Sequence, residues 1–216
     1  MHVKSEPWRL MTLVEEAQRG HLAAGHAVTP WDAAQIEALW DNILNEWPIG
    51  PIVLLDVSAN HEHPWHGRIG PHSAHVAASR RLVIEEGIGK LAALVWSLRE
   101  PTRSMLRLVY TEEVALWGKY TLVLDIKQRR ARFMSAGFDQ SKYLPVYLLP
   151  ESGPCLKAMS TMELTPVDRE WVNQSARRLH DAKCPIYIFP DSSTKLAERM
   201  LTNIRKIGTM DCYACL

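Results

Sequence analysis

The clearest periodic pattern in the chain lies between about Pro30 and Trp47. Apolar residues recur there at helical spacing and share one face of a helix: Ala33, Ile36, Leu39, Trp40, Ile43, Leu44 and Trp47. Thr29 before Pro30 is typical of a helix start, and Pro48 and Gly50 end the pattern. The sequence therefore predicts a helix that packs its tryptophans, Trp47 included, into a core.

Short apolar runs predict strands on both sides of a long loop. Residues 51–57 form one continuous apolar run, and residues 81–84 form a second. The second run leads through a glycine-containing turn into a helical pattern over 91–98, which Pro101 stops. The intervening residues 58–79 are rich in His, Gly and Pro and show no period, so they predict a loop.

The second half of the chain predicts a hairpin, a long helix and a further strand. Residues 120–127 and 130–134 are predicted to form paired strands, and Pro145 limits the apolar run 143–149 to an edge strand or an extended segment. Thr165 caps a helix to about Ala182, a strand follows at 185–189, and a last helix is predicted to about Ile207. A strand-like run also lies at 106–110. Interleaved helices and strands predict one α/β domain with a mixed sheet and packed helices.

Composition narrows the function classes. The 216 residues are 47% hydrophobic and 23% charged, which suits one globular domain. The 25 basic and 24 acidic side chains give a net charge of +1, so no overall field attracts nucleic acid or an anionic membrane. We expect no membrane-spanning segment and no secretory signal. Four cysteines are too few to suggest a disulfide framework. Together these features predict a cytoplasmic protein.

The turn between strand 81–84 and helix 91–98 is the best candidate site. Gly87 and Gly89 can adopt backbone angles that are closed to other residues, and free N–H groups at a helix start can hold a phosphate. Lys90 adds a positive charge, and the carboxylate of Glu85 or Glu86 suits Mg²⁺. The alternative is a plain glycine turn that joins a strand to a helix.

Three other groups of residues carry weaker hypotheses. A loop holds imidazoles that suit metal ions: His61, His63, His66, His72 and His75. A Cys-x-x-Cys pair lies at the chain's last residues: Cys212 and Cys215. A predicted hairpin is basic: Lys127, Arg129, Arg130 and Arg132. The histidines form either a metal site or a solvated loop. The cysteine pair is either a zinc or redox site or an accidental spacing. The basic hairpin is either a phosphate contact without sequence preference or a solvated turn.

Four segments, in order, resemble one family. They are the helix with Trp31, Gln35 and Trp40, the turn Glu86-Gly87-Ile88-Gly89-Lys90, the strand pair 120–133, and the segment 201–208 with Asn203 and Arg205. Together they are similar to the N-terminal, ParB/sulfiredoxin-like domain of GmrSD-type DNA-restriction proteins. The resemblance implies an extension over 1–28, this domain over 29–209 and a tail over 210–216.

The resemblance also implies a site and an activity. Family members are thought to bind and hydrolyse a nucleotide with Mg²⁺ to drive DNA cleavage by a nuclease domain. If the family's residue roles apply to this chain, Glu86 lies at the metal, and Gly87, Gly89 and Lys90 lie at the phosphates. Trp31 and Arg205 would then border the pocket. We expect any nuclease for DNA to come from another chain.

Departures from the family's motifs leave two functional hypotheses open. Glu86 replaces an Asp, Ile88 and Gly89 replace two glutamines, and Lys90 replaces an Arg. These losses remove side chains that position a reacting water or stabilise charge. The first hypothesis is a divergent nucleotide-binding module of a DNA-defence system. The second is a catalytically inactive relative that binds a partner or forms a homodimer.

Overall fold

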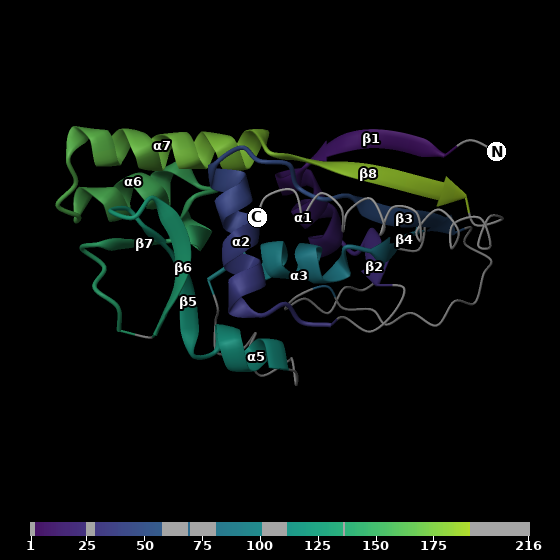
Figure 1. The fold of residues 1–216 in the computed structure, drawn as a ribbon, viewed down its shortest axis with the longest axis horizontal. Coiled ribbons are helices and arrows are strands. Elements are labelled where there is room, and N and C mark those ends of the chain that lie inside the picture. The colour runs from purple at the N-terminus through teal and green to yellow at the C-terminus, as the bar shows by residue number, and fades with distance from the viewer. Residues whose placement is uncertain are drawn as a thin grey trace, which may run out of the picture.

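The computed structural model describes residues 3–24, 29–57, 69, 81–100, 112–135 and 137–190 (Figure 1). The elements in chain order are β1 (Lys4–Arg9), α1 (Leu10–Gln18), β2 (Leu22–Ala24), α2 (Ala33–Leu44), β3 (Ile52–Val57), β4 (Arg81–Glu86), α3 (Ile88–Ser97), α5 (Glu112–Trp117), β5 (Tyr120–Asp125), β6 (Arg130–Ser135), β7 (Tyr143–Pro145), the 3-10 helix η1 (Val146–Leu148), α6 (Ser152–Ser160), α7 (Pro166–Asp181) and β8 (Lys183–Pro190). The mixed α/β class predicted from the sequence is confirmed.

The larger sheet has the strand order β1-β8-β3-β4-β2 and mixes directions. β3 runs parallel to β8 and antiparallel to β4, and β4 runs parallel to the short β2. The strands predicted at 51–57, 81–84 and 185–189 are confirmed as β3, β4 and β8. Residues in β3 alternate between two faces, because Ile52 and Leu54 join the main core whereas Val53 and Leu55 join a smaller cluster.

Residues 4–24 supply two strands of this sheet and one helix. β1 pairs antiparallel with β8 at one edge, and β2 pairs with β4 at the other. Between them α1 buries Leu10, Leu13 and Val14 in the main core. Within the segment 1–28, which the resemblance implies is an extension, residues 4–24 thus supply both edge strands and a core helix.

The smaller sheet is an antiparallel β6-β5-β7 arrangement. The predicted hairpin is confirmed as β5 and β6, and its turn is held by the backbone N–H of Gln128, which donates to Asp125 Oδ1 at 3.0 Å. β7 lies at the sheet edge, as Pro145 predicts, and the chain then turns into η1. The predicted run 143–149 therefore divides into a short strand and a 3-10 turn.

Helix α2 stands between the two sheets (Figure 1). Its buried Trp40 donates from Nε1 to Ser97 Oγ of α3 at 3.0 Å, and Glu37 accepts from the backbone N–H of Phe133 in β6 at 2.7 Å. The N-cap is Asp32 and not Thr29, because Asp32 forms a reciprocal capping box with Gln35. The helix therefore starts three residues later than the sequence predicts.

The end of α2 corrects another prediction. The helix ends at Leu44, and Glu46 has a left-handed φ of 58°. Because this turn breaks the helical period, Trp47 leaves the apolar face and is 59% exposed. The prediction that Trp47 packs in the core is wrong, whereas Trp40 is fully buried.

Helix α7 confirms its predicted start. Thr165 and Asp168 form a capping box with Pro166 at the first helical position, and the helix buries Val172, Ser175 and Leu179. The predicted elements at 106–110 and 191–207 lie outside the described residues. Within the described ranges, none of the helices is long and apolar enough to cross a membrane.

Candidate functional site

The turn from β4 to α3 depends on a left-handed glycine. Gly87 has a φ of +88° and serves as the N-cap of α3. A Cβ at this position would lie 2.8 Å from Ile52 Cγ1 of β3, a distance at which atoms clash. Both the backbone angle and the close approach of β3 therefore require glycine at residue 87.

Trp31 lies directly on the second glycine of the turn. A Cβ at Gly89 would stand 2.6 Å from Cδ1 and Nε1 of the Trp31 ring and 3.1 Å from the carbonyl oxygen of Thr29. Trp31 is itself half-buried and packs against the main core. The structure thus brings together Trp31, Gly87 and Gly89, and the indole occupies the space beside the start of α3.

The Lys90 side chain points into the protein. Only 9% of the residue is exposed, and Nζ donates to the carbonyl oxygens of Gly50 and, at 3.1 Å, Pro51. Burial lowers the pKa of Lys90, while the nearby Cys184 and Glu86 partly offset that effect. The ammonium group joins the end of β4 and the start of α3 to the segment before β3.

Glu86 is half-buried and lies close enough to Lys90 to act on its charge. Among the described residues, no group of three or more His, Cys, Asp or Glu side chains is placed to hold a metal ion. Arg205 lies outside the described residues, as do the five loop histidines and the Cys212/Cys215 pair. The predicted role of Glu86 at Mg²⁺ therefore stays a prediction.

The described residues include two buried cysteines in the main core. Cys155 and Cys184 are free thiols, and Cys184 Sγ donates to the carbonyl oxygen of Gly50 at 3.3 Å. Burial raises the pKa of Cys184 to about 11 and also raises the pKa of Cys155. Because the thiolate is the nucleophile, neither thiol is suited to covalent catalysis at neutral pH.

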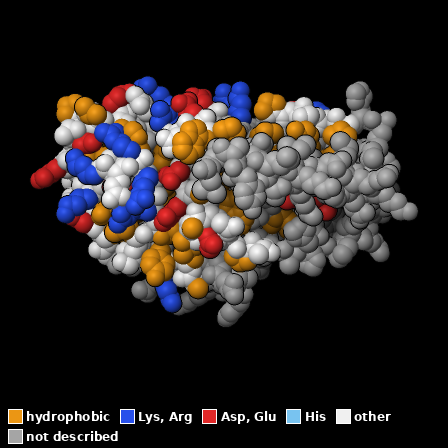
Figure 2. Space-filling view, viewed as in Figure 1, with side chains coloured by type: hydrophobic (Ala, Val, Ile, Leu, Met, Phe, Trp, Pro, Cys, Tyr) orange, Lys and Arg blue, Asp and Glu red, His pale blue; other side chains and the backbone are white. Residues whose placement is uncertain are grey.

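The charges of the basic hairpin are largely paired within the protein. Lys127 Nζ and Arg129 Nη2 lie 3.1 and 3.2 Å from the two carboxylate oxygens of Asp168, and Arg132 lies 3.2 Å from Asp125. Figure 2 shows Lys and Arg side chains gathered over the small sheet and α7, with acidic ones among them. This face is therefore mixed in sign, and its arginines are held in place by carboxylates.

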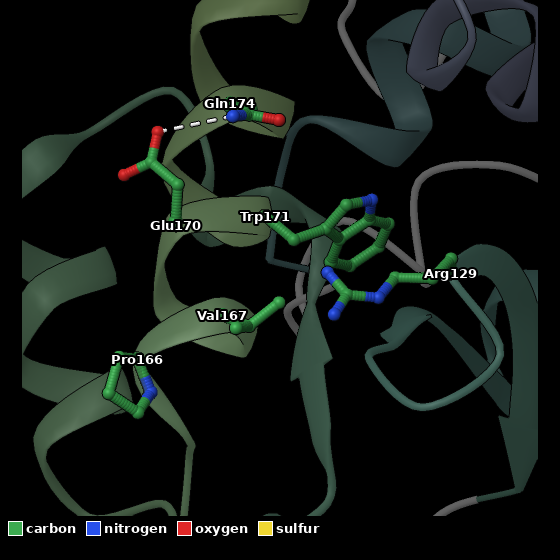
Figure 3. A pocket seen from close by; sticks show the side chains of 6 residues that line it. All are labelled: Arg129, Pro166, Val167, Glu170, Trp171 and Gln174. Atoms are coloured by element: carbon green, nitrogen blue, oxygen red, sulfur yellow. Dashed lines mark hydrogen bonds between the residues drawn. The ribbon is translucent and has the colours of Figure 1, made fainter.

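A pocket of about 400 Å³ opens between this hairpin and α7 (Figure 3). It is lined by Arg129, Pro166, Val167, Glu170, Trp171 and Gln174. The guanidinium of Arg129 lies over the Trp171 ring, 5.1 Å from its centroid. The side chain of Val167 is 69% exposed beside them, and Glu170 accepts from Gln174 at 3.2 Å on the rim.

Sequence reasoning missed this pocket although α7 carries a signal for it. Val167, Trp171 and Gln174 recur at helical spacing one position before the buried stripe of Asp168, Val172 and Ser175. Such a second stripe can either broaden a core face or lie on the surface, and the sequence does not decide between the two. Only the folded hairpin, which places Arg129 on the Trp171 ring, makes it a pocket.

A scan of protein-family models finds none that matches this chain, and a search of curated proteins finds no match either. The ParB/sulfiredoxin-like resemblance of the turn, the α2 region and the strand pair therefore stays a prediction.

Proposed function

We propose that this chain is a protein-binding module that does not turn over nucleotide. The observation that carries the proposal is the position of the Lys90 amine. This group, which the family resemblance assigns to phosphate, instead donates to the carbonyl oxygens of Gly50 and Pro51 and is buried. A phosphate at the turn would have to compete with both carbonyls for the ammonium group.

The packing around the glycines supports the same proposal. A Cβ at Gly87 would clash with Ile52, and a Cβ at Gly89 would clash with the Trp31 ring. Contacts within the protein therefore account for both glycines without a bound phosphate. The turn is therefore explained by the tight packing of the start of α3 against β3 and against the segment before α2.

The Trp171 pocket is the surface that we assign to the partner. Tryptophan and arginine are enriched among residues that dominate binding energy at protein interfaces. Arg129 is already oriented by Asp168 and by the Trp171 ring, so little side-chain freedom would be lost on binding. An apolar side chain of the partner would enter beside Val167 and Trp171, and a basic group would meet Glu170.

Thermal unfolding with each nucleoside triphosphate and Mg²⁺ tests the first half of the proposal. We expect no change in the midpoint for the wild-type chain at millimolar nucleotide. A ligand that binds only the folded state would stabilise it by about 2.7 kcal/mol at a hundredfold excess over Kd. A Mg²⁺-dependent shift that a Glu86→Gln variant loses would support the nucleotide-binding hypothesis instead.

Cross-linking from the pocket, followed by a binding measurement, tests the second half. A photoreactive residue at Val167 would identify the partner in cells, and affinity for the purified partner would then be measured. We expect Val167→Glu to weaken binding at least about tenfold, which is about 1.4 kcal/mol. Leu156→Glu on α6, which replaces a side chain that is 57% exposed, is the matched control and should leave affinity unchanged. Equal affinities for both variants would remove the pocket from the interface.

A further inference from the structure

A second cavity, of about 370 Å³, lies at the opposite end of α7 from the Trp171 pocket. It is bordered by the end of α2, the turn after it, the end of α7 and the start of β8. Its lining includes Ile43, Glu46, Trp47, Ile49, Arg178 and Asp181. We name it the Trp47 groove. Ile43 and Ile49, 1% and 5% exposed, provide buried apolar surface in it.

Trp47 is held outside the core by its backbone. Glu46 adopts a left-handed φ of 58°, which is costly for a residue other than glycine. The N–H of Trp47 then donates to the carbonyl oxygen of Asn42 at 2.8 Å, and this bond fixes the turn. Trp47 is therefore 59% exposed beside the groove, and tryptophan is among the residues that dominate binding energy at protein interfaces.

Charges of both signs line the groove. Arg178 Nε lies 3.4 Å from Glu46 Oε2, and Nη1 donates to the carbonyl oxygen of Leu44 at 2.6 Å, so this pair is part of the wall. Asp181 and Lys183, both exposed, form no ion pair with any described residue. Asp181 is also the last residue of α7, where the helix dipole disfavours a carboxylate.

We infer that the occupant of the Trp47 groove is a second copy of this chain. In a two-fold dimer the same patch meets itself, and a patch that carries a projecting group, a hollow and both signs of charge can complement its own copy. The Trp47 groove has all three, since Trp47 projects beside an apolar hollow and Asp181 lies two residues from Lys183. In this dimer Trp47 enters the groove of the other copy, and Asp181 faces the partner's Lys183.

This inference is independent of the proposed partner surface, because the two surfaces lie at different ends of α7. Its test is the oligomeric state, measured by sedimentation equilibrium of the full chain. We expect a dimer for the wild-type chain, and at least about a tenfold rise in the dimer dissociation constant for Trp47→Ala. Val167→Glu, in the other pocket, should leave the dimer unchanged.

A charge exchange gives the sharper arm of the test. In an Asp181→Lys dimer two ammonium groups would meet at each contact, and in a Lys183→Asp dimer two carboxylates would meet. Each variant alone should therefore be monomeric, whereas an equal mixture should form a heterodimer in which opposite charges meet again. Circular dichroism checks that both variants are folded.

Several outcomes would overturn the inference. These are a wild-type chain that stays monomeric at several hundred micromolar, single variants that remain dimeric, and a mixture that does not pair. Dissociation by Val167→Glu would place the dimer at the Trp171 pocket instead.

Discussion

At the residue scale, the turn from β4 to α3 shows how one glycine can be explained by packing. Gly89 has no left-handed backbone angle, and its constraint is the indole of Trp31. A methyl group there must displace the ring, which also lies against the core. Gly87 differs, since both its φ and its contact with Ile52 exclude a side chain.

A double-mutant cycle tests the contact between Trp31 and Gly89. We expect Gly89→Ala to lower the free energy of unfolding by about 1–3 kcal/mol, because overpacking forces the ring and its neighbours to move. In a Trp31→Ala background the same change should cost less than about 0.5 kcal/mol, because the ring is gone. Chemical denaturation of the four chains measures both values, and equal costs in the two backgrounds would show that the indole does not lie on Gly89.

The predicted site could be identified from the sequence only in part. Sequence reasoning placed Trp31, Gly87, Gly89 and Lys90 together, and the structure brings these four residues together. It could not foresee where the Lys90 ammonium points. Its acceptors, the carbonyls of Gly50 and Pro51, lie 40 and 39 residues away along the chain. No local pattern specifies such a contact.

At the scale of elements, helix α7 is fixed at its start by one carboxylate with two tasks. Asp168 accepts from the Thr165 hydroxyl at 2.7 Å as part of the capping box, and it also accepts from Lys127 and Arg129 of the β5–β6 turn. The hydrogen bonds from Thr165 and Lys127 lower the pKa of Asp168 to about 2. The helix start and the hairpin are therefore joined through this side chain.

The pH dependence of stability tests this joint. Because the folded pKa of Asp168 lies below the unfolded value of about 3.9, its contribution is present above about pH 4 and is lost as the pH falls through about 2. An Asp168→Asn variant should therefore unfold at a lower temperature at neutral pH, and the gap to wild type should narrow toward about pH 2. Glu163→Gln, an exposed substitution, is the control. A gap independent of pH would show that the ion pairs contribute nothing.

At the scale of the whole molecule, residues 4–24 supply both edge strands of the larger sheet. β1 covers β8, β2 covers β4, and α1 packs its buried face against the core between them. The sequence gives little sign of this role, because Lys4–Arg9 is polar and Leu22–Ala24 is only three residues long. Their strand structure depends on the neighbours with which they pair.

Truncation tests whether this segment is integral to the fold. A chain that begins at residue 25 should lose the cooperative thermal transition that the full chain shows by circular dichroism. It lacks two strands and the buried side chains of Leu10, Leu13, Val14 and Ala17, and burial of such side chains contributes about 1.5–3 kcal/mol each for the larger ones. A truncated chain that unfolds within a few degrees of the full chain would identify 1–24 as a separable extension.

The sequence by itself determined the elements whose signals are local. Capping residues and apolar periods lie within a few positions of one another, so α2, α7, the β5–β6 hairpin and the buried strands β3, β4 and β8 followed from them. Tertiary structure alone decided the strand order, the edge roles of β1 and β2, the inward direction of Lys90 and the exposure of Trp47. Those features depend on contacts between segments far apart in the chain, and no pattern within a single segment encodes them.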